Sequence, residues 1–270
     1  TVIAYITPEN SNYWRNYYDT YYASAYPNAI QIETYEGFSS TRKFNCHGYA
    51  WHMTEGGEDR WIGLGSPYDN DPEKKYWQDN SYIEVSSAVY PGKVNWSLGD
   101  HSAVTTDQSG WFISKWNEFP LMLHAWDDSP YGTQGIKYYK LNKPTISNNT
   151  TAICNNSQRT LVSDISDSNF TYDWSVLSYY LNEISGDGTP FYTVEGTSNI
   201  GYSTIYLTVS TPSGATVSTH DYVGVNTPYP GNLSFSLLNT NGTPVSYMCP
   251  ETHYHIYLNN DDGCSLSNYN

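Results

Sequence analysis

The chain carries little charge, and positive charge is the scarcer sign. Charged residues make up 14% of its 270 residues, and 12 Lys and Arg against 27 Asp and Glu give a formal net charge of −15. Nucleic-acid binding needs clustered Lys and Arg to neutralise phosphates, and anionic membranes attract segments of the same kind. The composition therefore excludes nucleic acids and anionic membrane surfaces as main partners.

Long apolar runs and a leader sequence are also missing. No apolar run approaches the ~20 residues that a membrane-spanning helix requires, so we expect no transmembrane segment. Because there is no starting Met and no basic, apolar leader, we interpret the chain as a mature or trimmed product. The composition is rich in Tyr and Trp, with 28 and 9 residues, and poor in Lys, which favours a secreted or bacterial cell-surface protein.

Cysteine is scarce and dispersed. The four residues are Cys46, Cys154, Cys249 and Cys264, and the last two are candidates for a disulfide. Since no C-x-x-C pair is present, a zinc ribbon or thioredoxin-type site is excluded. Acidic patches at 69–71 and 261–262 lack the glycine and final glutamate of a calcium loop, so we interpret them as solvated surface. We expect no cofactor and no metal ion.

The character of the chain changes near residues 141–144. Most Trp residues precede this point, whereas runs of period two, such as residues 205–210, follow it. Short alternating runs separated by turn clusters are typical of an antiparallel sandwich. We therefore predict three domains, at residues 1–142, 143–228 and 229–270.

An internal repeat supports this division. The segment that begins at Cys154 is followed by Tyr172-Asp173-Trp174-Ser175, and a similar segment begins at Cys249 and ends near the point where its tryptophan would come. Repeated sandwich units are expected to recur whole. Residues 229–270 are thus expected to be the start of a second, truncated module. With Ile184–Thr189 and Tyr222–Val225, these motifs resemble immunoglobulin-like or PKD-like modules of Bacteroidetes-type surface proteins.

The front part contains one clear helical pattern. Between Asn12 and Tyr26, aromatic residues recur at spacings of three and four, which predicts a helix with an aromatic face packed on the core. Residues 56–98 are rich in Gly, Pro, Asp and Trp. We expect loops with short strands there, forming the walls of a cleft.

Cys46 is the candidate nucleophile. Asn45 is a good helix N-cap and Gly56-Gly57 a good helix end, so Cys46 is expected in the first turn of a helix. The positive end of the helix dipole promotes a reactive thiol. Two alternatives remain, a buried structural cysteine and a zinc site of Cys46, His47 and His52, although a spacing of five between the histidines does not favour the second.

His101 is the candidate base. Residues 101–106 and 111–116 alternate around a turn, and a three-residue loop with Gly110 would pair His101 with Asn117. Asn117 would then orient the imidazole, as the third member of a Cys-His-Asn set. A two-residue loop would instead turn Asn117 to the other face. His124 is the alternative base or a substrate-binding residue.

These motifs resemble those of NlpC-type and CHAP-type cysteine hydrolases. Asn45-Cys46-His47-Gly48 resembles their cysteine motif, His101-Ser102-Ala103-Val104 their histidine motif, and Lys115-Trp116-Asn117 the Glu-x-Asn of CHAP domains, with Lys in place of Glu. The resemblance covers residues 30–140. It implies a papain-like α+β domain, here followed by an all-β immunoglobulin-like sandwich, and thiol hydrolysis of amide bonds without a cofactor.

The sequence therefore predicts an extracellular cysteine peptidase or amidase that acts on peptides or peptidoglycan. The catalytic set would be Cys46, His101 and Asn117, with cleft walls drawn from Trp51, Trp77, Trp116 and Trp126. The alternative is a non-catalytic adhesion or carbohydrate- and peptide-binding protein with a degenerate papain-like domain. Hydrolysis and acyl transfer are not separated by the sequence, and the oligomeric state stays open.

Overall fold

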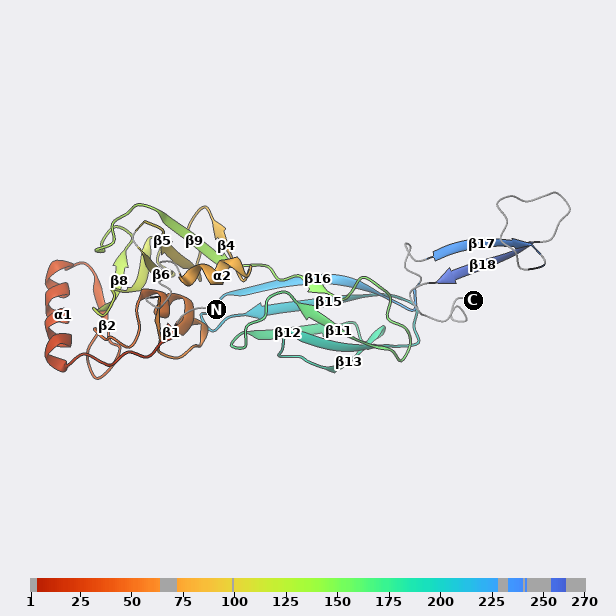
Figure 1. The fold of residues 1–270 in the computed structure, drawn as a ribbon, viewed down its shortest axis with the longest axis horizontal. Coiled ribbons are helices and arrows are strands. Elements are labelled where there is room, and N and C mark those ends of the chain that lie inside the picture. The colour runs from red at the N-terminus through yellow and green to blue at the C-terminus, as the bar shows by residue number, and fades with distance from the viewer. Residues whose placement is uncertain are drawn as a thin grey trace. The chain divides into compact units, whose positions relative to one another are not determined.

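The computed structural model describes residues 4–63, 72–98, 100–227, 233–239, 241 and 254–260 (Figure 1). The chain divides into two compact units, which are described one at a time. The first comprises residues 1–143 with the short segments 167–171 and 209–217, and the second comprises the remaining residues.

A seven-stranded antiparallel sheet forms the centre of the first unit, in the order β2-β8-β7-β6-β5-β9-β4. Its strands are β2 (Ile30–Ile32), β4 (Tyr82–Val85), β5 (Lys93–Trp96), β6 (His101–Thr105), β7 (Trp111–Lys115), β8 (Leu121–Ala125) and β9 (Ile136–Leu141). A separate antiparallel pair joins β1 (Ala4–Tyr5) to β3 (Trp61–Ile62). Short strands within residues 56–98 match the prediction for that segment.

The predicted N-terminal helix is confirmed as α1 (Asn12–Ala25). Its buried stripe is narrower than expected, because Tyr18 and Tyr22 pack on Phe119 while Trp14 and Tyr17 remain 48% exposed. The deepest residue of the helix is Arg15, which donates hydrogen bonds to main-chain carbonyls and pairs with a glutamate. The most buried residue of this helix is thus a charged side chain that lies outside the predicted aromatic face.

The remaining helical segments are short. They are the π-helical η1 (Gly48–His52), the 3-10 helices η2 (Met53–Glu55) and η3 (Pro72–Lys74), and α2 (Lys75–Gln78). Gly56 ends η2 in a left-handed conformation, with φ of 84°, which confirms the predicted helix end. Within the described residues, no helix has the length and apolar character to cross a membrane.

The predicted papain-like α+β fold is wrong. Strands dominate both units, and the described part of the first unit has α1 as its one helix longer than two turns. The segment after Cys46 is a π-helical turn followed by a 3-10 turn, where the sequence predicted a short helix that ends at Gly56-Gly57. The N-cap and stop signals were read correctly, but such signals fix the ends of a helical segment and not its regularity.

The two faces of the seven-stranded sheet bury different kinds of side chain. One face carries Val94, Trp96, Ala103 and Phe112, a buried apolar cluster against which Tyr131, Ile136 and Tyr138 pack. The other face carries the alternate residues of the same strands, and the segment from Cys46 to Glu55 packs on it. We call this second face the helix-side face.

The second unit is built from strands alone in its described part. A four-stranded sheet has the order β10-β11-β14-β13, and a three-stranded sheet the order β12-β15-β16. The strands are β10 (Ile146–Ser147), β11 (Gln158–Ser163), β12 (Thr171–Val176), β13 (Leu181–Ser185), β14 (Phe191–Gly196), β15 (Gly201–Ser210) and β16 (Thr216–Val225). Trp174 of β12 stacks on Tyr192 of β14, with ring centroids 5.2 Å apart, so the two sheets share a core. Membership of an immunoglobulin-like or PKD-like family stays a prediction.

The C-terminal described segments form one antiparallel pair, β17 (Leu233–Asn239) with β18 (Tyr254–Asn260). Whether they begin a second module stays a prediction. The acidic patches at 69–71 and 261–262, and the suggested pairing of Cys249 with Cys264, lie outside the described residues.

Candidate functional site

Asn45 fixes the backbone around Cys46. Its side-chain Oδ1 accepts hydrogen bonds from the amides of Gly48 and Ile62, at 2.9 and 3.1 Å, and its Nδ2 donates to the Ile62 carbonyl at 2.6 Å. The predicted capping role of Asn45 is thus confirmed. A Cβ atom on Gly48 would collide with the carbonyl oxygen of Arg60. The first turn after Cys46 is therefore tied to the neighbouring β3 segment.

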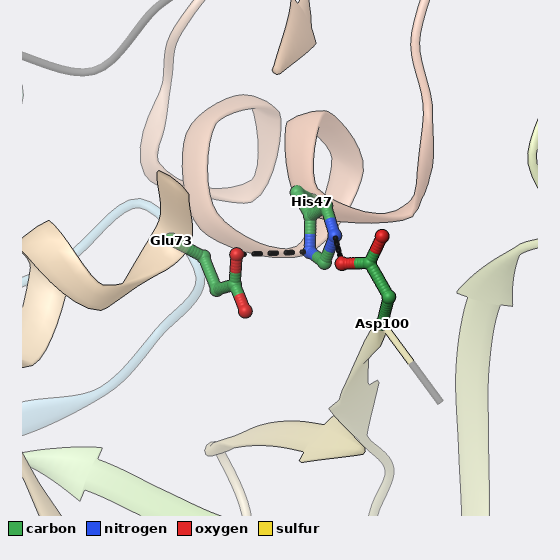
Figure 2. A group of neighbouring side chains, drawn as sticks. All are labelled: His47, Glu73 and Asp100. Atoms are coloured by element: carbon green, nitrogen blue, oxygen red, sulfur yellow. Dashed lines mark hydrogen bonds and ion pairs between the residues drawn. The ribbon is translucent and has the colours of Figure 1, made fainter. Parts of the chain in front are cut away.

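Cys46 carries a free thiol and is 6% exposed. Its neighbour His47 is 3% exposed, and both ring nitrogens of His47 have oxygen partners. Nδ1 lies 2.8 Å from the Ser102 hydroxyl, and Nε2 lies 3.1 Å from Oδ1 of Asp100. Figure 2 shows the imidazole between two carboxyl groups, Asp100 on one side and Glu73 on the other.

The surroundings of His47 favour its protonated form. Burial lowers the pKa of His47, but the negative charge and hydrogen bonding of Cys46, together with Asp100 and Glu73, outweigh burial and raise the pKa well above its ordinary value. The charged form of the imidazole is therefore favoured. A cationic ring next to a free thiol is the arrangement that thiol catalysis uses.

Glu73 completes the cluster from η3. Its Oε1 accepts a hydrogen bond of 2.7 Å from Asn95, and its Oε2 lies 3.6 Å from Nδ1 of His47 with no hydrogen-bond partner in the described structure. Burial raises the pKa of Glu73, and the charge of His47 opposes that effect. The two buried groups therefore depend on each other for charge balance.

His47, Glu73 and Asp100 are also metal-ligand types, and their nearest ligand atoms lie within 4.8 Å of one another. A metal needs a free lone pair on the imidazole. Both nitrogens of His47 are engaged, and its raised pKa keeps the ring protonated. We interpret the group as a hydrogen-bonded ion-pair network. Among the described residues it is the single such group of three, so the alternative zinc set with Cys46 and His52 is not assembled.

Four polar residues of the helix-side face contact the segments that pack on it. Ser102 contacts His47 and accepts a 2.9 Å hydrogen bond from the Trp51 indole. Lys93 pairs with Glu55, and Asn95 binds Glu73. Lys115 lies under Phe44, with Nζ 5.6 Å from the ring centroid. Each of these buried polar groups has a partner on the loops above the sheet.

His101 points to the other face. Successive side chains of a strand alternate, so His101 leaves β6 on the side opposite Ser102 and stacks on Tyr131. The ring is fully buried, and neither nitrogen has a hydrogen-bond partner among the described atoms. Burial, with the charges of His124 and His47, lowers the pKa of His101 well below its ordinary value. The structure does not join His101 to Cys46 by a hydrogen bond.

The predicted register between β6 and β7 is wrong by one residue. Val104 pairs with Ile113, and this register continued along the strands sets His101 opposite Trp116 and not Asn117. The loop has four residues, since the Thr106 amide donates to the Trp111 carbonyl. Asn117 lies in the turn after β7, exposed, with φ of 58°. It makes no hydrogen bond to His101.

His124 is held in place on β8. Its Nδ1 donates to the Ala125 carbonyl at 2.8 Å, which leaves Nε2 to accept from the Ser114 hydroxyl, also at 2.8 Å. Burial lowers its pKa, and the Ala125 carbonyl and Asp128 oppose this effect. The basic lone pair of His124 is therefore occupied by Ser114.

Of the tryptophans proposed as cleft walls, Trp51 and Trp116 are fully buried, Trp77 stacks on Tyr139, and Trp126 is exposed. The sequence reading missed Glu73, Asp100, Ser102 and Lys115. Asp100 and Ser102 flank the predicted histidine in one motif, and both contact His47. Glu73 carried no signal, because nothing in its local pattern distinguishes it from a surface glutamate.

No model of a known protein family matches this sequence, and no curated protein matches it.

Proposed function

We propose that the first unit is a cysteine-dependent amide hydrolase in which Cys46 is the nucleophile and His47 carries the proton. The observation that supports this best is the buried His47 imidazole, which directly follows Cys46 in the chain and which Asp100 and Ser102 hold in place. Asp100 then takes the orienting role that the sequence reading gave to Asn117. The register of β6 and β7 supports this change.

In the proposed reaction, the starting state is the ion pair of ionised Cys46 and protonated His47, and the sulfur attacks the amide carbonyl carbon. The carbon–nitrogen bond breaks, and His47 gives the proton to the leaving amine. Water then attacks the thioester while His47 accepts its proton. When the carbon–sulfur bond breaks, the sulfur leaves with the electron pair and His47 keeps the proton from water, which restores the starting ion pair. Amide and water become acid and amine, and no cofactor is consumed.

The substrate class rests on chemistry and on the resemblance of the two motifs. A thiol nucleophile with a histidine suits amide bonds, and the motif resemblance extends this to peptides or peptidoglycan. The disulfide at Cys154 supports a secreted or bacterial cell-surface location, because disulfides persist in oxidising compartments. In that setting, the second unit would serve as a spacer between the surface and the hydrolase.

The test is alkylation of Cys46 by iodoacetamide at pH 7, with the modified residue identified by peptide mass mapping. We expect Cys46 in the folded protein to react about tenfold faster than free cysteine, and Cys46→Ala to show no modification at this position. His47→Gln should slow alkylation, whereas His101→Gln should not. The same variants are then assayed on peptide and peptidoglycan fragments for new amine and carboxyl ends.

Three outcomes would count against this assignment. Slow alkylation of the folded wild-type protein would remove the nucleophile and favour the adhesion or binding alternative. Loss of reactivity in His101→Gln with full reactivity in His47→Gln would return the base to His101. Transfer of the acyl group to an added amine, without release of acid, would make the protein a transferase that uses the same thioester.

A further inference from the structure

A cavity of about 630 Å³ lies on the helix-side face of the seven-stranded sheet. This volume is within the range of about 300 to 1,000 Å³ that is usual for small-molecule sites. The strand pairing sets four residues of this face side by side as the floor of the cavity: Lys93, Val104, Ile113 and Leu123. The floor thus crosses the middle of the sheet, from β5 to β8.

The apolar part of this floor is not covered by the protein. Val104, Ile113 and Leu123 are half-buried, although the residues before and after Val104 and Leu123 in their strands are buried. On the next row of the same face, Ser102 and Lys115 are fully buried. The fold therefore closes one row of the helix-side face and leaves the neighbouring apolar row accessible.

The walls of the cavity add further apolar surface. Met53 and Gly56 line it from η2 and its end, and Pro91 lines it from the loop before β5. Pro212 also lines it, from the segment 209–217 of the same unit. An apolar ligand body would therefore find apolar side chains on the floor and on the walls.

The hydroxyl groups that line the cavity are already used by the protein. Those of Thr105 and Thr106 donate to main-chain carbonyls at 2.7 and 3.0 Å, and that of Thr54 does so at 2.8 Å. The hydroxyl of Ser213 donates to Glu55 at 3.1 Å. A ligand therefore gains little from hydrogen bonds inside the cavity, and its buried part should be apolar.

The two charged residues that line the cavity differ in their pairing. Lys93 is buried, and Glu55 neutralises it while Thr54 accepts a further hydrogen bond at 2.7 Å. Asp107 is exposed in the turn after β6 and has no ion-pair partner among the described residues. The net charge of −15 has the same sign as this carboxylate. The cavity therefore favours a ligand with a positive group.

We propose that this cavity binds a ligand with an apolar body and an ammonium group, with the body on the floor and the ammonium group at Asp107. An aryl or alkyl amine has this chemistry, and so has the N-terminus of a peptide that begins with a large apolar residue. Burial of the apolar body provides the affinity, and the carboxylate discriminates against anions. The inference does not rest on the proposed function, because it uses neither Cys46 nor His47.

The first test compares three probes that share one apolar body and differ in charge. Phenethylamine, phenethyl alcohol and hydrocinnamate are titrated at pH 7, and the methyl signals of Val104, Ile113 and Leu123 are followed by NMR. We expect all three signals to shift with phenethylamine, which should bind about fivefold more tightly than the alcohol. Hydrocinnamate should bind most weakly. Unchanged methyl signals with the amine, or equal binding of hydrocinnamate, would overturn the proposal.

The peptide Phe-Gly-Gly distinguishes the two sources of the ammonium group. Binding of phenethylamine without the peptide would identify free amines as the ligand class. Binding of the peptide at least as tightly as phenethylamine would identify peptide N-termini. Both results support the proposed chemistry, since the same ammonium group and apolar ring are recognised in each case.

The second test uses variants of the cavity. Asp107→Asn should weaken phenethylamine binding about fivefold and leave binding of the alcohol unchanged. Asp173→Asn, at an exposed aspartate of the second unit, makes the same change in net charge and should affect neither probe. Val104→Phe fills the floor and should prevent binding of both. Wild-type affinity for the amine in Asp107→Asn, or in folded Val104→Phe, would overturn the assignment.

Discussion

Tyr131 lies flat against His101, with ring centroids 3.5 Å apart and ring planes within 6° of parallel. The stack covers an imidazole whose two nitrogens have no protein partner in the described structure. An uncharged ring tolerates this environment far better than an imidazolium, because burial penalises the charged form. The pair is therefore a neutral aromatic stack, in contrast to the cationic His47 on the other side of β6.

The first prediction concerns acid stability. Because the folded state lowers the pKa of His101, the unfolded chain binds the proton more readily, and stability is lost as pH falls below about 6.5. His101→Phe keeps the stack and removes this proton. Between pH 6.5 and 5, we expect its free energy of unfolding to fall less steeply than that of the wild type, by up to about 1.4 kcal/mol per pH unit.

Urea unfolding at a series of pH values measures this difference. Tyr131→Phe is the matched control, since it keeps both rings and should leave the wild-type slope unchanged. If the free energy of unfolding changed with pH equally in His101→Phe and in the wild type, the folded protein would protonate His101 without cost.

The second prediction has the opposite sign. The folded state raises the pKa of His47, so its contribution to stability is complete below about pH 6.5 and is lost as pH rises through the folded value. His47→Gln lacks that contribution. We expect the variant to be less stable than the wild type by about 2 kcal/mol at pH 6, with the gap narrowing by pH 9. A gap that stays constant from pH 6 to 9 would contradict a raised pKa.

The third prediction concerns Gly48. A methyl group there would meet the Arg60 carbonyl, and neither the backbone of β3 nor that of η1 can move freely. Gly48→Ala should cost more than about 2 kcal/mol in thermal or urea unfolding. Gly37→Ala is the control, since it has open space and a φ of 81°, so backbone strain alone should cost about 1 kcal/mol. Equal effects of the two substitutions would argue against the clash.

The fourth prediction concerns the buried pair of Glu55 and Lys93. Tyr82 donates to Glu55 Oε1 at 2.7 Å, and Lys93 is the cation that neutralises this carboxylate. Lys93→Met leaves the carboxylate buried and unpaired, which should cost about 3–5 kcal/mol of unfolding free energy. The double variant with Glu55→Gln should recover most of that loss. Denaturant titration of the single and double variants gives the coupling energy, and purely additive effects would contradict the pairing.

The local signals of the sequence were reliable where one residue controls one feature. Asn45 as a cap, Gly56 as a stop and the span of α1 all follow from short-range rules that the structure obeys. The papain-like fold was inferred from motif order alone, and the structure overturns it with sheets that no short motif encodes. The pairing of distant strands depends on the whole chain, so short sequence motifs do not predict it.

The predicted pairing of residues 101–106 with 111–116 was in error for the same reason. A one-residue error in the register of β6 and β7 removed Asn117 from the site. Lys93 and Asn95 alternate with apolar neighbours, a pattern that is typical of a strand with one face in solvent. All four residues of β5 are nevertheless buried. Both faces of this sheet are covered, and the polar side chains on one face are partners of loops far away in the sequence.

Asp100 gives the buried network a path to water. His47 is nearly inaccessible, but the Asp100 side chain that touches its Nε2 is 59% exposed. The carboxylate therefore connects the interior imidazole to the surface, and dissolved ions screen that carboxylate directly. Ionic strength should therefore influence His47, although solvent does not contact this residue. A change in salt concentration alone should alter how fast His47 exchanges its proton.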